Sequence, residues 1–146
     1  MPTPTSMSNS LFVDTSGWVS IIGQNETFHQ ACSEAYQQAM QQKQGLVTTN
    51  YILTEVVALL INRSIVPRQQ MIVFIDALER SPQLTILMID RAVHDEAWAL
   101  MKARADKAWS WVDASSFVVM RRLGITEALT TDHHFAQAGF VKLPAV

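Results

Sequence analysis

The sequence predicts an α/β fold in which helices cover both faces of a parallel sheet of short strands. Short apolar runs alternate along the chain with longer segments of helical periodicity, which is the pattern of successive strand–helix units. The chain has 146 residues, 49% of them hydrophobic, which suits one well-packed domain rather than two. Only 16% of the residues are charged, and this low value excludes a wholly disordered chain.

The first half of the chain is expected to form two strands and three helices after a short tail. Residues 1–9 include two prolines and several small polar residues, which predicts a flexible N-terminal tail before a single domain at 10–146. The hydroxyls of Thr15 and Ser16 suit the start of a helix, and Gly45 suits the end of one. The expected elements are a strand at 10–14, helices at 15–22 and 26–43, a strand at 46–48, and a buried, mostly apolar helix at 51–62 capped by Asn50.

The second half continues the same alternation. Pro67 suits a first helical turn, Asp90 and Asp113 suit helix starts, and Gly124 and Gly139 suit helix ends. The expected elements are a helix at 67–80, a strand at 84–89, a helix with Val93, Ala97, Leu100 and Met101 on one stripe, a helix from Asp113 to Gly124, a strand at 128–130, a helical turn at 132–135, and a strand at 140–143. Ligands of such parallel sheets bind beyond the carboxyl ends of the strands, where functional residues are therefore expected.

Charge and composition exclude several classes of protein. The chain has 11 basic and 13 acidic residues, so a generally basic surface for nucleic acid is disfavoured. Cys32 is the single cysteine, which excludes an internal disulfide framework and a cysteine-rich zinc site. No apolar run is long enough to span a membrane, and the first residues do not have the pattern of a signal peptide. We therefore expect a cytoplasmic protein without membrane contact.

Four acidic residues are candidates for function, although three have a simpler explanation. Asp14, Asp113 and Asp132 each stand where a helix is expected to begin, so each could be only an N-cap, as Asp90 is expected to be. Glu55 has no such explanation, because aliphatic residues surround it within its helix. A buried carboxylate is costly unless it is paired with a cation or binds a metal. Carboxylates gathered without cysteine or histidine suit Mg²⁺ or Mn²⁺, which assist phosphodiester hydrolysis.

The segments around these acids resemble the four acidic motifs of the PIN-domain ribonucleases. The similar segments are 11–16, 48–55, 111–117 and 125–135, and they occur in the order and spacing of that family. The resemblance extends from about residue 10 to the C-terminus. It implies a three-layer α/β/α sandwich of the PIN type, and members of this size are often the VapC-like toxin of a toxin–antitoxin pair.

The resemblance also implies specific roles for residues. Asp14, Glu55, Asp113 and Asp132 would bind one or two Mg²⁺ or Mn²⁺ ions and catalyse endonucleolytic cleavage of RNA, leaving a 5′-phosphate and a 3′-hydroxyl. The supporting hydroxyls of the family would fall on Thr15, Ser16, Ser116 and Thr130. A small antitoxin protein and a second copy of the chain are the partners that the resemblance implies.

Basic residues outside the motifs are candidates for contacts to RNA. They are Arg63, Arg68, Arg121, Arg122 and His133. Arg121 and Arg122 are equally compatible with a solvated helix end, where cations are favoured by the helix dipole. His133 and His134 are adjacent, so their side chains are not expected to face the same way and form a transition-metal site. The alternative to a nuclease is a scaffold of the same fold that binds RNA or protein with weak or no catalysis.

Overall fold

The molecule is built around one sheet of parallel strands. The computed structural model describes residues 7–146. The strands are β1 (Leu11–Val13), β2 (Leu46–Thr49), β3 (Leu84–Leu87), β4 (Glu127–Leu129) and β5 (Val141–Leu143). All four neighbouring pairs are parallel, and the strand order is β3-β2-β1-β4-β5. β1 is therefore the central strand, and the predicted parallel sheet is confirmed.

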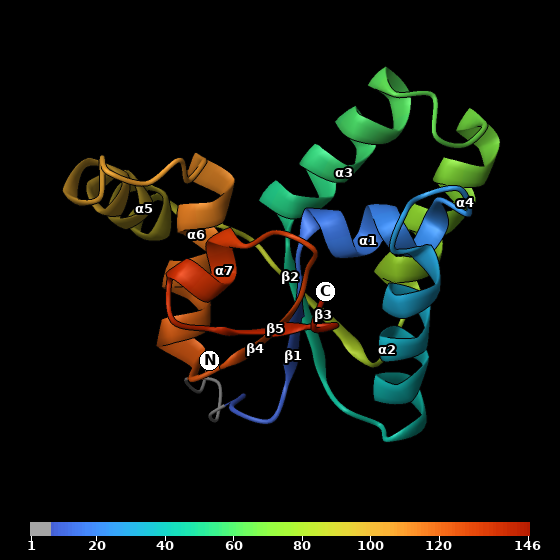
Figure 1. Cartoon of the computed structure of the whole chain (residues 1–146), viewed down its shortest axis with the longest axis horizontal. Coiled ribbons are helices and arrows are strands. Elements are labelled where there is room, and N and C mark those ends of the chain that lie inside the picture. Colours follow the sequence, from blue (N-terminus) through green and yellow to red (C-terminus); the bar gives the residue numbers. More distant parts are fainter. Residues whose placement is uncertain (1–6) are drawn as a thin grey trace.

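Helices cover both faces of this sheet, as the sequence predicts. They are α1 (Thr15–Ile22), α2 (His29–Gln41), α3 (Asn50–Asn62), α4 (Arg68–Arg80), α5 (Arg91–Ala103), α6 (Trp111–Leu123) and α7 (His134–Gln137). Figure 1 shows α5, α6 and α7 on one side of the strands and α2 and α4 on the other, while α3 rises from the end of β2. The arrangement is the three-layer α/β/α sandwich.

The central strand is apolar because it is covered on both faces. Leu11, Phe12 and Val13 are all buried, with Phe12 and Val13 fully inaccessible. A strand of a parallel sheet with helices on both sides has no polar face, so a continuous apolar run is the expected pattern. On one side the indole of Trp18 in α1 donates a hydrogen bond of 3.1 Å to Thr48 Oγ1 at β2. This contact joins the first helix to the strand that leads into α3.

The residues that cap α6 and α3 differ from the prediction, and α2 and α7 begin at His29 and His134 rather than at residues 26 and 132. Ser110 caps α6: its hydroxyl accepts a hydrogen bond from the Asp113 backbone, and the Asp113 carboxylate accepts one from the Ser110 backbone. Asp113 thus lies inside the first turn, because a hydroxyl three residues earlier completes a capping box. Thr49 rather than Asn50 caps α3, since Thr49 Oγ1 accepts from the Ile52 backbone.

α3 is partly exposed to solvent, whereas the N-cap of α5 agrees with the prediction. α3 is not buried all round: Thr54 and Ala58 are exposed and Ile61 is 45% exposed. The prediction of a wholly buried helix was wrong there, because α3 extends beyond the sheet, where neighbouring elements cover only part of it. Asp90 caps α5 as expected, accepting a hydrogen bond of 2.9 Å from the Val93 backbone.

At the N-terminal end, the expected tail at 1–9 lies partly outside the described residues. From Met7 onward the chain contacts the domain, because the Met7 backbone donates a hydrogen bond of 3.1 Å to the Leu123 carbonyl. Met7 also packs against the core. Among residues 7–146, no helix combines the length and apolar character needed to cross a membrane.

Candidate active site

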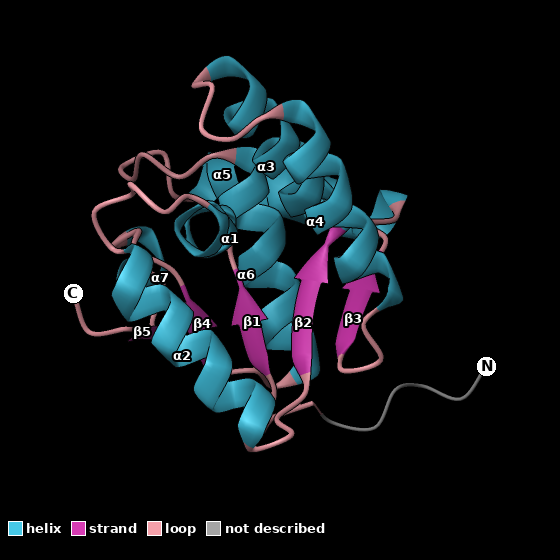
Figure 2. Ribbon diagram, turned by 90° about the vertical axis from the view of Figure 1, so that its right-hand side faces the viewer, coloured by secondary structure: helices cyan, strands magenta, loops and turns pink. Residues whose placement is uncertain are grey.

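The carboxyl edge of the sheet holds one cavity that all four candidate acids line. Asp14 directly follows β1, Asp132 follows β4, Glu55 lies on α3 after β2, and Asp113 lies in the first turn of α6. The cavity has a volume of about 280 Å³. In Figure 2 the arrowheads of β1 and β2 point toward α1 and α3, which bound this end of the sheet. We call these four carboxylates the acid cluster.

Asp14 does not act as a helix cap through its side chain. It occupies the N-cap position of α1, but its carboxylate makes no capping hydrogen bond. Instead, Asp14 Oδ2 accepts hydrogen bonds of 3.0 Å from Thr130 Oγ1 and 3.2 Å from Ser16 Oγ. Asp14 is only 3% exposed. These contacts hold a buried, oriented carboxylate in the lining of the cavity, and its oxygens do not bond to the N–H groups of the helix.

Thr130 and Ser16 form a hydroxyl network that joins β4 to α1. Their oxygens lie 3.0 Å apart. Ser16 Oγ accepts from the Thr131 backbone at 2.9 Å, and Thr130 Oγ1 accepts from the Asp132 backbone at 3.0 Å. The same two hydroxyls therefore hold Asp14 and the loop that carries Asp132. Both hydroxyls are among those that the family resemblance places near the acids, and the structure brings them into contact with Asp14.

The other two expected hydroxyls differ from each other. Thr15 lines the cavity and is buried, and its oxygen is the one buried side-chain polar atom in residues 7–146 that lacks a hydrogen bond of normal geometry. It lies beside Glu55 and opposes the rise in the pKa of that residue. Ser116 instead donates to the Val112 carbonyl at 3.0 Å and is not among the cavity residues. Its hydroxyl is used within α6, as is usual for serine inside a helix.

His134 is the residue of the site that the sequence did not single out for this role. Its Nδ1 lies 2.9 Å from Asp113 Oδ2 and 3.1 Å from Asp132 Oδ2. Its backbone N–H also donates to Asp132 Oδ1 at 2.9 Å. His133, which the sequence suggests as a contact to RNA, has a side chain that is 74% exposed, and its Nδ1 lies 3.7 Å from Asp132 Oδ1. In the sequence, the only feature that indicates this role for His134 is its position two residues after Asp132.

Burial and the charges of neighbouring acids raise the pKa values of Asp14, Glu55 and Asp113. Burial, with the charge of Asp113 next in importance, raises the pKa of Asp14 from 3.8 to about 7. Burial also raises the pKa of Asp113, and the nearby Asp132 adds to this rise. The pKa of half-buried Glu55 is raised by burial and by the charges of Asp113 and Asp132. Carboxylates forced together in this way disfavour their ionised forms until a cation compensates them.

The basic residues suggested as RNA contacts fall at different distances from the cavity. Arg63 lines it and pairs with Glu26 at 3.1 Å. Arg68 begins α4 and borders a different hollow. Arg121 and Arg122 lie at the far end of α6, roughly 12 Å along the helix axis from Asp113 at 1.5 Å per residue. Arg122 pairs with Glu96 there. Of the four arginines, only Arg63 contributes to the cavity.

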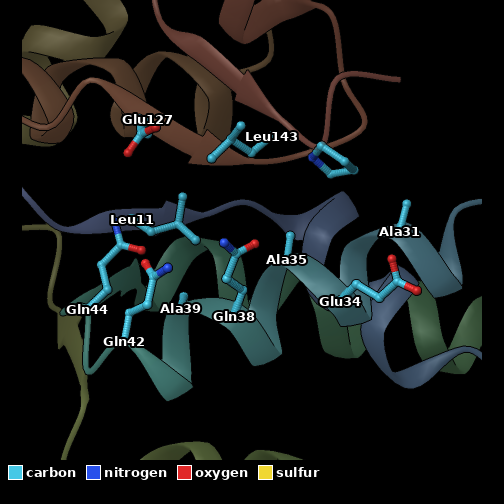
Figure 3. Close-up of a pocket in the computed structure, with 11 residues that line it drawn as sticks. Leu11, Ala31, Glu34, Ala35, Gln38, Ala39, Gln42, Gln44, Glu127 and Leu143 are labelled. Atoms are coloured by element: carbon cyan, nitrogen blue, oxygen red, sulfur yellow. The ribbon is translucent and has the colours of Figure 1, made fainter.

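A second and larger hollow lies away from the acid cluster. It has a volume of about 520 Å³ and is lined by residues of α2, the first residues of β1 and β4, and the end of β5. Figure 3 shows the glutamines of this hollow, Gln38, Gln42 and Gln44, facing Leu11 of β1. It contains none of the four candidate acids, so the predicted chemistry does not belong to it.

A match to the PIN domain family covers residues 11–141, which includes the whole sheet and the acid cluster. The chain belongs to the PIN domain family. The segments that resemble this family in sequence are those that the fold brings to the cavity.

Relatives of this PIN domain include a characterised nuclease. The chain is 28% identical over 133 residues to the 23S rRNA-specific endonuclease VapC20 of Mycobacterium tuberculosis, covering 91% of this chain and 97% of that protein. The crystal structure of VapC20, described as a sarcin–ricin loop cleaving toxin, matches with a TM-score of 0.79 at 29% identity, over 90% of this chain and 97% of that one. FitAcB from Neisseria gonorrhoeae matches with a TM-score of 0.57 at 16% identity, over 90% and 95% of the two chains, and shares the fold.

The residues of the cavity fit a hard divalent cation. All of its ionisable donors are carboxylates, and the described lining contains one basic side chain, Arg63, beside five acidic ones. Buried Thr15, whose hydroxyl oxygen lacks a hydrogen bond of normal geometry, also lines this cavity. Oxygen donors with excess negative charge are what Mg²⁺ and Mn²⁺ prefer.

Proposed function

We propose that this protein is an endoribonuclease that depends on Mg²⁺ or Mn²⁺ and acts as the toxin of a toxin–antitoxin pair. The observation that supports it most is the convergence of four carboxylates from four separate segments on one cavity with a single arginine. A cluster of this kind is unfavourable for a structural role alone, because buried like charges repel one another. The similarity of this chain to the endonuclease VapC20, which extends over 91% of its residues, supports the same activity.

In this proposal the acid cluster, the two hydroxyls that hold Asp14, and Arg63 have separate tasks. Asp14 is the central ligand, and Glu55, Asp113 and Asp132 complete the set of metal ligands. When bound, the metal supplies a Lewis acid that neutralises phosphate oxygens and makes a water molecule acidic enough to attack. Thr130 and Ser16 fix the direction of the Asp14 carboxylate through its Oδ2 atom. Arg63, at the rim, attracts the phosphate backbone of the substrate.

The substrate we propose is a loop of ribosomal RNA. VapC20 is named as specific for 23S rRNA and as cleaving the sarcin–ricin loop. Single-stranded loops present unstacked bases that a protein can contact specifically, whereas the bases of paired strands are stacked and their pairing edges are occupied. Transfer RNA and messenger RNA are the competing substrates, and they belong in the same assay.

The partners follow from the same proposal. A toxin requires an antitoxin, and we propose a small protein that blocks the cavity and is encoded beside this gene. We also propose a homodimer and action in the cytoplasm, where the ribosomal substrate is located. Co-expression with the product of a neighbouring small reading frame should suppress toxicity and yield a complex on size-exclusion chromatography.

The test is cleavage of defined RNAs by the purified protein. Intact ribosomes, a sarcin–ricin loop oligonucleotide, transfer RNA and messenger RNA are incubated with Mg²⁺, Mn²⁺ or EDTA. Cleavage of the loop that EDTA abolishes, and that Asp14→Asn reduces by at least roughly 1000-fold, is the expected result. Arg122→Ala, at the far end of α6, is the matched control and should cleave normally. Failure to cleave any RNA, or equal cleavage by Asp14→Asn, would overturn the assignment.

A further inference from the structure

We infer that His134 is a positioning residue that holds Asp113 and Asp132 together so that both can bind the same divalent cation. This inference rests on the proposed metal-dependent function. It goes further by assigning the metal affinity of the site partly to a side chain outside the acid cluster. The inference comes from three independent features of His134: its contacts, its anchoring and its contrast with His133.

The contacts of His134 occupy specific carboxylate oxygens. Its backbone N–H donates to Asp132 Oδ1, and its ring Nδ1 lies 3.1 Å from Asp132 Oδ2. The same Nδ1 lies 2.9 Å from Asp113 Oδ2, which also accepts from the Ser110 backbone at 2.9 Å. Because both neighbours of Nδ1 are acceptors, this nitrogen carries the hydrogen. The ring N–H therefore donates to Asp113, while the backbone N–H donates to Asp132 and the same ring nitrogen lies 3.1 Å from Asp132 Oδ2. In this way His134 bridges two carboxylates that would otherwise repel each other.

The bridge has a physical consequence for metal binding. Asp113 and Asp132 come from α6 and from the loop after β4, so no backbone element fixes their spacing. Donors behind a carboxylate orient it and leave its remaining lone pairs for a cation. His134 orients both acids in this way. On Asp113, the Oδ2 atom accepts both hydrogen bonds, one from His134 Nδ1 and one from the Ser110 backbone. The loss of such outer partners typically weakens metal affinity by about 10- to 100-fold.

His134 itself is held in place by its neighbour in the chain. Phe135 is fully buried and packs edge-on against Phe117, with the ring centroids 5.0 Å apart. Phe117 lies four residues after Asp113 on α6, and residues at this spacing share one helix face. The packing that seats α7 on α6 therefore sets the imidazole of His134 over the carboxylate of Asp113. The side chain of His134 is 18% exposed, as expected for a constrained residue.

His133 provides the matched comparison. It precedes His134 in the chain and has the same side-chain chemistry, but its side chain is 74% exposed and its Nδ1 is 3.7 Å from Asp132 Oδ1. Within residues 7–146, no hydrogen bond or ion pair joins His133 to Asp113. An effect that comes merely from removing a histidine near the site would appear in both variants. An effect of the bridge would appear only at His134.

The experiment measures Mn²⁺ binding without RNA, by electron paramagnetic resonance and calorimetry, for the wild type and for His134→Ala, His134→Asn and His133→Ala. Mn²⁺ should bind to His134→Ala about 10- to 100-fold more weakly than to the wild type. His133→Ala should stay within about twofold of the wild type. His134→Asn, whose amide nitrogen can replace Nδ1 as a donor, should recover much of the affinity. Circular dichroism and thermal unfolding identify variants that fail to fold.

Three results would overturn the inference. They are unchanged Mn²⁺ affinity in folded His134→Ala, equal weakening in His133→Ala, and no recovery in folded His134→Asn. If His134→Ala does not fold, the comparison between His134→Asn and His134→Gln replaces it, since glutamine places its donor one carbon farther out and should bind more weakly. Wild-type protein that binds no Mn²⁺ would remove the proposed function and this inference together. If the wild type binds Mn²⁺ and the folded His134 variants bind it with unchanged affinity, only the inference about His134 is overturned.

Discussion

Thr130 donates a hydrogen bond of 3.0 Å to the buried carboxylate of Asp14, across a sequence separation of 116 residues. The contact joins the end of β4 to the end of β1, which are neighbours in the sheet. The same hydroxyl accepts from the Asp132 backbone at 3.0 Å. One side chain thus fixes two members of the acid cluster, and its removal should affect both.

Thr130→Val tests this role, because valine keeps the shape and removes the hydroxyl. The Asp132 N–H and the Asp14 carboxylate would each lose a partner in a buried site, so the unfolding free energy should fall by about 1–3 kcal/mol. RNA cleavage should fall by about tenfold or more, because Asp14 is no longer oriented. Thr130→Ser retains the hydroxyl and should retain most activity. Equal activity in the two variants would contradict the role given to the hydroxyl.

Asp14→Asn should make the metal-free protein more stable at high pH. The pKa of Asp14 is about 7 in the folded protein against an ordinary value of 3.8, so folding takes up a proton between these values. Wild-type stability therefore falls as the pH rises through this window, by up to about 4 kcal/mol. Asparagine removes this contribution. Urea unfolding in EDTA should show the variant more stable at pH 8 and little different below pH 4.

Metal provides the control for the pH prediction. Ligands that bind only the folded state stabilise it, so Mn²⁺ should raise the unfolding temperature of the wild type. Asp14→Asn lacks the central carboxylate and should respond much less. Parallel stability curves of the two proteins across pH 4 to pH 8 in EDTA would contradict the raised pKa of Asp14.

Gly17→Ala should destabilise the site through the backbone. A β-carbon at Gly17 would lie 2.5 Å from the Leu129 carbonyl oxygen, at the end of β4. α1 and β4 would have to separate, at a cost of roughly 1–3 kcal/mol. The displacement would also pull Ser16 away from Thr130. Gly45→Ala is the control, because its nearest neighbour is the Ser10 hydroxyl at 3.0 Å, a side chain that can move. Equal unfolding temperatures for the two variants would contradict the close approach of α1 to β4.

Arg63→Ala should weaken substrate binding without removing the chemistry. Arg63 lines the cavity, so its loss should raise KM for RNA by about 5- to 20-fold, corresponding to roughly 1–2 kcal/mol of a charge-assisted contact. The value of kcat should change less. Arg68→Ala, outside the cavity, should leave KM near that of the wild type. If Arg68→Ala raised KM and Arg63→Ala did not, the RNA would be expected to bind across α4 instead.

Much of the fold follows from the sequence because its signals are local. The apolar run Leu11–Val13 is consistent with a strand covered on both faces, and Gly124, with φ of 72°, ends α6 where a left-handed residue is needed. The exact residue at which a helix starts depends on which nearby polar side chain accepts a hydrogen bond from the first backbone N–H groups. Ser110 and Thr49 act as caps where Asp113 and Asn50 were expected, since several polar residues near each start compete for the same backbone donors.

The four carboxylates proposed for the chemistry can be read directly along the chain, because they occur in a family-like order. Which of these carboxylates also cap a helix depends on their neighbours in the folded protein. The Asp14 side chain caps nothing and is held by Thr130, whereas Asp113 is both a capping partner and a member of the cavity. The tertiary structure also sets the Ser116 hydroxyl against its own helix, and it brings His134 within 3.1 Å of two acids while His133 approaches only Asp132, at 3.7 Å. The distances between these side chains and their burial depend on residues that are far apart in sequence. The packing of α7 on α6 and the pairing of β4 with β1 set these distances and this burial.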